Sequence, residues 1–233
     1  MPQDADPKTE IRAIVFDLDG TLVDSVGDLT AALQDFLAPL GFPAFTDADI
    51  RRWMGTDADD IIAGLMADYA FDPGAAFDLA AAASDFLDFY DVYPHGCSVP
   101  FDGAAEVLRE LTAAGLAIGV CTNKREALSR AILTDLGLIG WIGALAGCDT
   151  TDHKKPHPAP LLHVLDRLHI APRNAIMVGD SINDILVGRA SGTAYVVGAD
   201  YGYPRRPEDL DGADYRIKTL TGLRALEKAW VVV

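Results

Sequence analysis

Residues 11–21 read IRAIVFDLDGT, and this stretch decides the fold. Its first part, Ile11–Phe16, is a short apolar run rich in β-branched residues and predicts a buried strand. Asp17 and Asp19 follow at the point where this strand should end. In an open parallel sheet, ligands bind beyond the carboxyl ends of the strands, so the two aspartates are the first candidates for a functional site.

Similar apolar runs recur along the chain and predict further strands. They are Leu116–Cys121, Ala175–Val178, Ala194–Val197 and a fainter one at Ala144–Ala146. Segments with helical spacing separate them: Phe101–Ala114, Arg125–Leu136, Pro158–His169 and Ile182–Ala190. Because continuously apolar strands alternate with helices, we predict an α/β fold with a parallel sheet that helices cover on both faces.

The block after the first strand differs, because its apolar spacing is that of helices only. The expected helices are Val26–Leu40, Asp47–Met54, Asp59–Tyr69 and Ala75–Tyr90. We interpret residues 24–93 as an α-helical domain inserted into a core domain of residues 10–23 and 94–233, with residues 1–9 as a flexible tail. The alternative is a single layer of helices packed on the sheet.

Composition excludes several classes of function. The chain of 233 residues is 50% hydrophobic and 23% charged, which is typical of a soluble globular protein. Its net charge of −16 argues against binding to nucleic acid or to an anionic membrane, since both need a basic face. The longest stretch without polar side chains, Leu136–Cys148, has 13 residues and falls short of the ~20 that span a bilayer.

The three cysteines, Cys97, Cys121 and Cys148, are widely spaced and odd in number. This pattern fits neither a disulfide framework nor a zinc site. We therefore expect unpaired thiols in a reducing compartment and a cytoplasmic location.

Four aspartates follow the predicted strands. Asp17 and Asp19 project to the same side of an extended segment, and Asp180 and Asp184 share a face if a helix begins at Ile182. Carboxylates this close repel one another unless a cation neutralises them or one takes a proton. An all-oxygen set of ligands with open positions favours Mg²⁺, so all four aspartates are candidate metal ligands.

The other polar residues at these strand ends suit an anion. Thr122 and Asn123 offer a hydroxyl and an amide donor, Lys155 offers a full positive charge, and the backbone amides near Gly20 and Thr21 add further donors. Two roles stay open for Lys124: it steers a phosphate toward the site, or it is simply exposed to solvent. With the charge of a phosphoryl group neutralised in this way, a carboxylate can attack phosphorus.

The two acids of the first motif differ in expected mobility. Asp17 lies nearest the strand end and is the more rigid, so we expect it to be the nucleophile. Asp19 lies on the looser segment and is the better candidate for the general acid and base.

Four segments, in this order, resemble the motifs of the haloacid dehalogenase superfamily of phosphohydrolases. They are FDLDGTLVDS from residue 16, CTNK from residue 121, HKKPHP from residue 153 and GDSINDI from residue 179. The resemblance covers Phe16 to Ile185, with weaker similarity through Gly198–Tyr203. It implies a Rossmann-like core with a movable helical cap between the first and second motifs.

The resemblance also implies a role for each motif residue. Asp17 would form an aspartyl-phosphate and bind Mg²⁺, and Asp19 would be the general acid and base and give the metal its backbone carbonyl. Asp180 would bind Mg²⁺ directly, and Asp184 would bind it directly or through water. The phosphoryl group would be held by Thr122 and Lys155, with Asn123 beside them.

Within the superfamily the chain resembles the phosphoglycolate phosphatases most, which implies a small phosphorylated metabolite as substrate. Where that subfamily has a glycine–small–glycine turn, this chain has Gly55-Thr56-Asp57. Asp57, Asp59 and Asp60 place acid near a possible substrate carboxylate, and Arg51 and Arg52 offset it if either points inward.

The same residues are also compatible with other functions. A sugar phosphomutase or an inorganic pyrophosphatase would use the same site, although the resembling mutases tend to carry valine where Thr21 stands. A non-catalytic module that binds a phosphometabolite is the third possibility. We expect a monomer or a homodimer.

Overall fold

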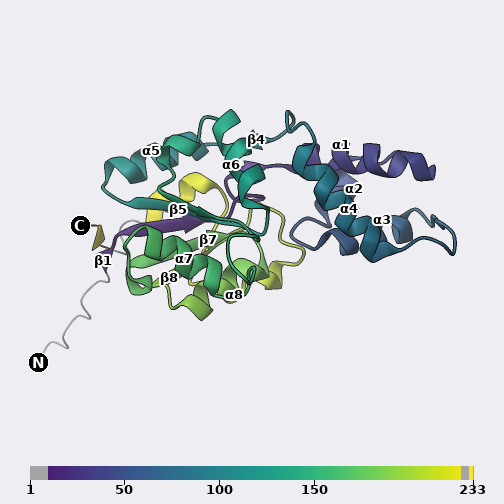
Figure 1. Ribbon diagram of the computed structural model, residues 1–233. Coiled ribbons are helices and arrows are strands. Elements are labelled where there is room, and N and C mark those ends of the chain that lie inside the picture. The colour runs from purple at the N-terminus through teal and green to yellow at the C-terminus, as the bar shows by residue number, and fades with distance from the viewer. Residues whose placement is uncertain (1–9, 227–230, 233) are drawn as a thin grey trace, which may run out of the picture.

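A parallel sheet of six strands forms the centre of the protein in a computed structural model that describes residues 10–226 and 231–232 (Figure 1). In spatial order its strands are β6 (Ala144–Ala146), β5 (Ala117–Cys121), β2 (Ala13–Phe16), β7 (Ala175–Gly179), β8 (Tyr195–Ala199) and β9 (Tyr215–Ile217). Strand β2 lies between β5 and β7, and all four of its residues are buried. The tail predicted for residues 1–9 lies outside the described residues.

Helices cover both faces of this sheet because β2 sends alternate side chains to opposite sides. Ile14 and Phe16 belong to one core cluster, whereas Ala13 and Val15 belong to another. In Figure 1 one face carries α5 and α6, and the opposite face carries α7 and α8. Their bounds are α5 Ala104–Ala113, α6 Glu126–Asp135, α7 Ala159–Arg167 and α8 Ile182–Ser191.

The helical insertion lies to one side of the sheet in Figure 1. It comprises α1 (Val26–Leu37), the 3₁₀ turn η1 (Ala38–Leu40), α2 (Asp47–Arg51), α3 (Ala58–Asp68) and α4 (Leu79–Val92). The two connections to the core pair with each other as an antiparallel ladder of β3 (Val23–Asp24) and β4 (Val99–Pro100). The predicted fold class, an α/β core with an inserted helical domain, is confirmed, while the domain boundaries at residues 24 and 93 stay a prediction.

Helix ends differ from the predicted ones for local reasons. Helix α4 begins at Leu79 rather than Ala75, because the Asp78 carboxylate caps it by accepting from the amide of Ala81 at 3.1 Å. The last turn predicted for α1 is a 3₁₀ turn that contains Pro39 and ends at Gly41, whose φ is +76°.

The run Ile11–Phe16 forms two short strands rather than one. Strand β1 (Glu10–Ile11) pairs with β10 (Val231–Val232), and β2 begins only at Ala13. The remaining short elements are η2 (Ile139–Trp141), η3 (Pro172–Asn174), η4 (Pro207–Leu210), η5 (Leu220–Gly222) and α9 (Leu223–Leu226). Within the described residues, none of the helices has the length and apolar character that a membrane crossing requires.

Candidate active site

Three neighbouring strands bring the predicted site residues together. Asp17, Thr122 and Asp180 each directly follow a strand, namely β2, β5 and β7, which lie side by side with their carboxyl ends at one edge. All three side chains are buried. Parallel strands in register therefore place a nucleophile candidate, a hydroxyl and an acid in one small volume.

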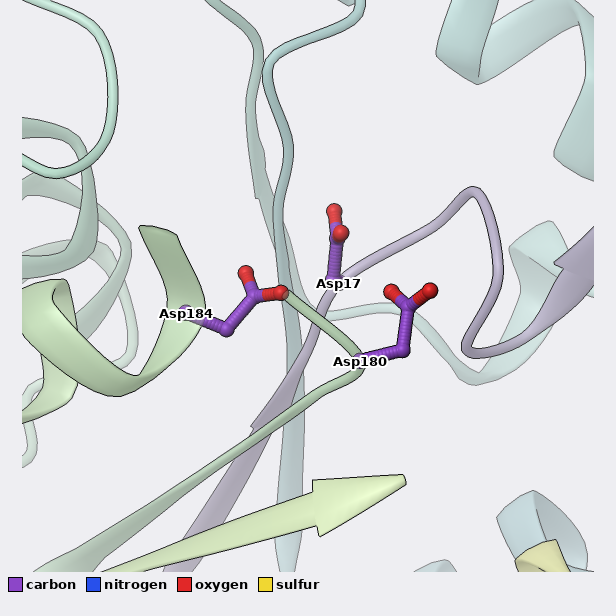
Figure 2. A group of neighbouring side chains, drawn as sticks. All are labelled: Asp17, Asp180 and Asp184. Carbon is purple, nitrogen blue, oxygen red and sulfur yellow. The ribbon is translucent and has the colours of Figure 1, made fainter. Parts of the chain in front are cut away.

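An acidic triad lies at this edge (Figure 2). Asp17, Asp180 and Asp184 each offer one carboxylate oxygen, and these oxygens lie within 4.8 Å of one another. Burial, followed by the charge of Asp184, raises the pKa of Asp17 to about 7. Burial and the charge of Asp17 also raise the pKa of Asp180 well above its ordinary value. Buried carboxylates this close need a cation or a proton, and hard oxygen ligands of this kind fit Mg²⁺.

Lys155 faces the triad and is only 2% exposed. Its Nζ lies 2.8 Å from Asp17 Oδ1 and 2.6 Å from Asp184 Oδ1. Burial alone would lower the pKa of Lys155, but the charges of the two aspartates outweigh it and raise the pKa above its ordinary value. Lys155 is therefore an ammonium group fixed beside the candidate nucleophile.

Asn123 holds Lys155 in place through its backbone. The Asn123 Oδ1 accepts from the Lys155 amide at 2.9 Å, and the Asn123 Nδ2 donates to the Lys155 carbonyl at 3.1 Å. Both ends of the Asn123 side chain are thus engaged by a loop far along the chain. The structure gives this residue a positioning role, and direct contact with substrate stays a prediction.

Asp184 belongs both to the triad and to the first turn of α8. Its Oδ2 accepts from the amide of Ser181 at 3.0 Å and from the hydroxyl of Ser181 at 2.6 Å, which forms a capping box. Asp184 is fully buried, so the helix cap also sets the position of this carboxylate in the triad.

Two glycines leave the space that Asp180 occupies. A Cβ on Gly20, whose φ is +82°, would lie 2.1 Å from Asp180 Oδ2, and a Cβ on Gly202 would lie 2.4 Å from Asp180 Cβ. The amide of Tyr203 donates to Asp180 Oδ2 at 2.6 Å. The sequence predicts that the amide of Gly20 faces a ligand. In the structure it instead donates to the Val23 carbonyl at 2.9 Å. Gly20 therefore serves the site by leaving room for a carboxylate.

Asp19 lies apart from the triad and has its own partners. Ser25 donates its hydroxyl to Asp19 Oδ1, and Lys124 Nζ lies 3.3 Å from the same oxygen. Lys124 also donates to the Tyr90 hydroxyl of α4 at 3.2 Å. Its side chain is 9% exposed, so the plain exposure considered for Lys124 is wrong.

Ser25, Lys124 and Tyr90 make contacts that sequence reasoning missed. Lys124 and Ser25 stand inside the motifs, but Tyr90 comes from the helical insertion. Burial is the largest single effect and lowers the pKa of Lys124, but the charges and hydrogen bonds of Asp19 and Tyr90 together raise it above its ordinary value, so Lys124 stays protonated. Asp19 thus lies beside a fixed positive charge that is itself bonded to the insertion.

A cavity of about 500 Å³ opens in front of these residues, between the sheet edge and the helical insertion. Its walls include Asp17, Asp19, Thr122 and Lys155. Arg51 and Arg52 do not point into it, and their contacts lie elsewhere. Arg51 pairs with Asp24 at 3.1 Å, and Arg52 pairs with Asp68 at 3.1 Å.

Comparison with known proteins decides the family. Residues 14–197 match the family described as haloacid dehalogenase-like hydrolase, and this range holds all the motifs above. The chain belongs to this family. The resemblance drawn from the sequence, a phosphohydrolase of the haloacid dehalogenase superfamily related to phosphoglycolate phosphatases, is confirmed.

Curated relatives agree with this assignment over most of the chain. The phosphoglycolate phosphatase of Rhodospirillum rubrum is 39% identical over 207 residues, which cover 87% of this chain and 85% of the relative. That of Nitrosococcus oceani is 36% identical over 82% of this chain and 84% of the relative. A crystal structure described as a predicted phosphoglycolate phosphatase from Haemophilus somnus superposes with a TM-score of 0.77 at 26% identity, covering 93% of this chain and 97% of that one. The chain is accordingly a phosphoric monoester hydrolase of the haloacid dehalogenase type.

Proposed function

We propose that this protein is a Mg²⁺-dependent phosphatase that hydrolyses a small organic phosphomonoester through an aspartyl-phosphate on Asp17. One observation supports this most: a buried carboxylate at the end of the central strand lies 2.8 Å from a buried ammonium and faces a cavity. The relatives are named for phosphoglycolate, so this ester is the first to assay.

The acidic triad suits Mg²⁺ because three buried carboxylates otherwise repel one another. Asp17 and Asp180 would hold the ion, with the Asp19 carbonyl as a further ligand and Asp184 binding directly or through water. When bound, Mg²⁺ supplies positive charge that offsets the repulsion between a carboxylate and the phosphoryl oxygens.

The first step would form the phosphoenzyme. Asp17 Oδ1 accepts from the Leu18 amide at 2.7 Å and from Lys155, so the other oxygen is left to attack phosphorus. As the new bond from oxygen to phosphorus forms, the ester bond breaks, and Asp19 gives a proton to the leaving oxygen. Lys155 and the Thr122 hydroxyl stabilise the charge on the phosphoryl oxygens.

The second step would release phosphate. Asp19, now a carboxylate, takes a proton from water as the water oxygen attacks phosphorus, and the bond to Asp17 breaks. Ser25 and Lys124 hold the Asp19 side chain in place for both proton transfers. Inorganic phosphate leaves, and both aspartates return to their starting states.

The test is phosphate release from p-nitrophenyl phosphate and a panel of phosphorylated metabolites that includes phosphoglycolate, with and without Mg²⁺. We expect Asp17→Asn to lower kcat at least about 10³-fold, because an amide cannot form the phosphoenzyme. Equal activity of wild type and variant would rule the mechanism out. Formation of an isomeric sugar phosphate without free phosphate would favour the mutase alternative.

A further inference from the structure

The part of the cavity that would receive the organic end of a substrate is largely apolar. Its walls carry the side chains of Leu29, Met54, Ile61, Phe86, Leu87 and Leu128. Leu87, on α4, is 41% exposed and lines the cavity. A surface of this kind gains free energy by covering an apolar group.

Among the described residues, every lysine and arginine that lines this cavity is already paired with an aspartate. Lys155 belongs to the phosphoryl end, where it contacts the triad. Toward the organic end, Lys124 pairs with Asp19 at 3.3 Å, and Arg125 pairs with Asp88 at 3.0 Å and also with Asp91.

Lys154 is the fourth of these lining cations. Its Nζ lies 2.5 Å from Asp57, at the start of α3. A carboxylate on the substrate would therefore have to share one of these cations with a protein carboxylate or displace it. It would also lie near Asp59 and Asp91, which line the same cavity. An anion placed there loses its hydration and meets like charges without gaining an unshared cation, whereas an uncharged group meets no such penalty.

We propose that the site selects phosphomonoesters with an uncharged, apolar leaving group larger than two carbons and discriminates against those that carry a carboxylate, such as phosphoglycolate. This inference rests on the proposed phosphatase function and names its substrate class. The cavity of about 500 Å³ lies within the range of about 300–1,000 Å³ usual for sites of organic ligands.

Matched alkyl esters test this selection, because their leaving alcohols have similar acidity. We expect kcat/KM for butyl phosphate to exceed the values for 3-carboxypropyl phosphate and for phosphoglycolate by at least about tenfold. It should also exceed the value for ethyl phosphate by about fourfold for each buried methylene. Carboxylated esters turned over as well as butyl phosphate, or better, would overturn the proposal.

Two variants and a matched control separate the effect of charge from the effect of apolar contact. Asp57→Asn frees Lys154, so the ratio of kcat/KM between the carboxylated ester (3-carboxypropyl phosphate) and butyl phosphate should rise about fivefold. Asp60→Asn removes the same charge from the same helix turn, outside the cavity, and should move this ratio less than about twofold. Leu87→Asn should reduce the advantage of butyl over ethyl phosphate.

Binding of non-hydrolysable phosphonates distinguishes the two proposals. Calorimetry with Mg²⁺ should show tighter binding of butylphosphonate than of 4-phosphonobutanoate. If no ester is hydrolysed while this preference in binding appears, the phosphatase proposal fails and the selectivity of the site stands. If 4-phosphonobutanoate binds as tightly, the selectivity fails whatever the activity.

Discussion

The buried Lys155 ammonium offsets three buried carboxylates, so its removal should affect both activity and stability. We expect Lys155→Met to abolish phosphate release and to lower the free energy of unfolding by about 3–5 kcal/mol at pH 8 without metal. Urea titration followed by fluorescence measures this loss. Lys154→Met is the matched control: its side chain is 47% exposed, and the change should stay below about 1 kcal/mol. A similar loss in both variants would contradict this account of Lys155.

Gly20 leaves room for Asp180, so adding one methyl group there should disturb the metal site. Gly20→Ala places a Cβ 2.1 Å from Asp180 Oδ2, and we expect Mg²⁺ affinity to fall at least about tenfold. Gly41→Ala controls for backbone strain, because Gly41 has a similar φ of +76° and an added Cβ there meets no atom of the described residues within 4 Å. Calorimetric titration with Mg²⁺ compares them, and equal affinities in the two variants would count against the packing argument.

Residues at strand ends were predictable, because their place in the site follows from local sequence. Asp17, Thr122 and Asp180 each follow an apolar run, and a parallel sheet brings such positions together. The actual contacts of Asn123 and Lys124 were not predictable. Their partners are the Lys155 backbone and Tyr90, which lie 32 and 34 residues away in the chain.

At the scale of elements, Asp28 ties helix α1 to the returning connection of the insertion. Asp28 is buried, and its carboxylate accepts from the amides of Cys97 at 2.7 Å and Ser98 at 2.9 Å. We expect Asp28→Ala to lower the free energy of unfolding by about 2–4 kcal/mol, because these amides lose their acceptor. Asp35→Ala, on the exposed side of α1, should cost less than about 1 kcal/mol. Thermal unfolding of both variants measures the difference. Equal losses of stability would show that Asp28 does not anchor α1 to the connection at Cys97 and Ser98.

The long elements of the fold were predictable, and the short ones were not. Strand β5 and helix α8 follow from apolar runs and spacing, and their bounds differ from the predicted ones by one residue. The pairs β1–β10 and β3–β4 have only two residues each, and their partners are far apart in the chain. Such ladders form only when distant parts of the chain come together, so local sequence does not predict them.

For the whole molecule, the acidic triad links pH to stability and to Mg²⁺. The pKa of Asp17 is about 7 in the folded chain against 3.8 in a free side chain, so its contribution favours folding below pH 3.8 and is lost as pH rises through 7. Mg²⁺ binds the deprotonated form. We expect Mg²⁺ to raise Tm more at pH 8 than at pH 5. Scanning calorimetry at both pH values measures this, and an equal rise at both would contradict the link.

The oligomeric state, which we predict to be a monomer or a homodimer, stays a prediction.

The pairing of β3 with β4 has a consequence for how such enzymes diversify. It brings the entrance and the exit of the helical insertion next to each other, so a different insertion can be joined to the core at the same two short strands. The phosphoryl-transfer residues then remain on the sheet while the organic end of the substrate meets a separable module. Swapping the insertion between relatives, with Ser25 and Tyr90 kept, becomes a route to transplanting substrate preference onto the same reaction centre.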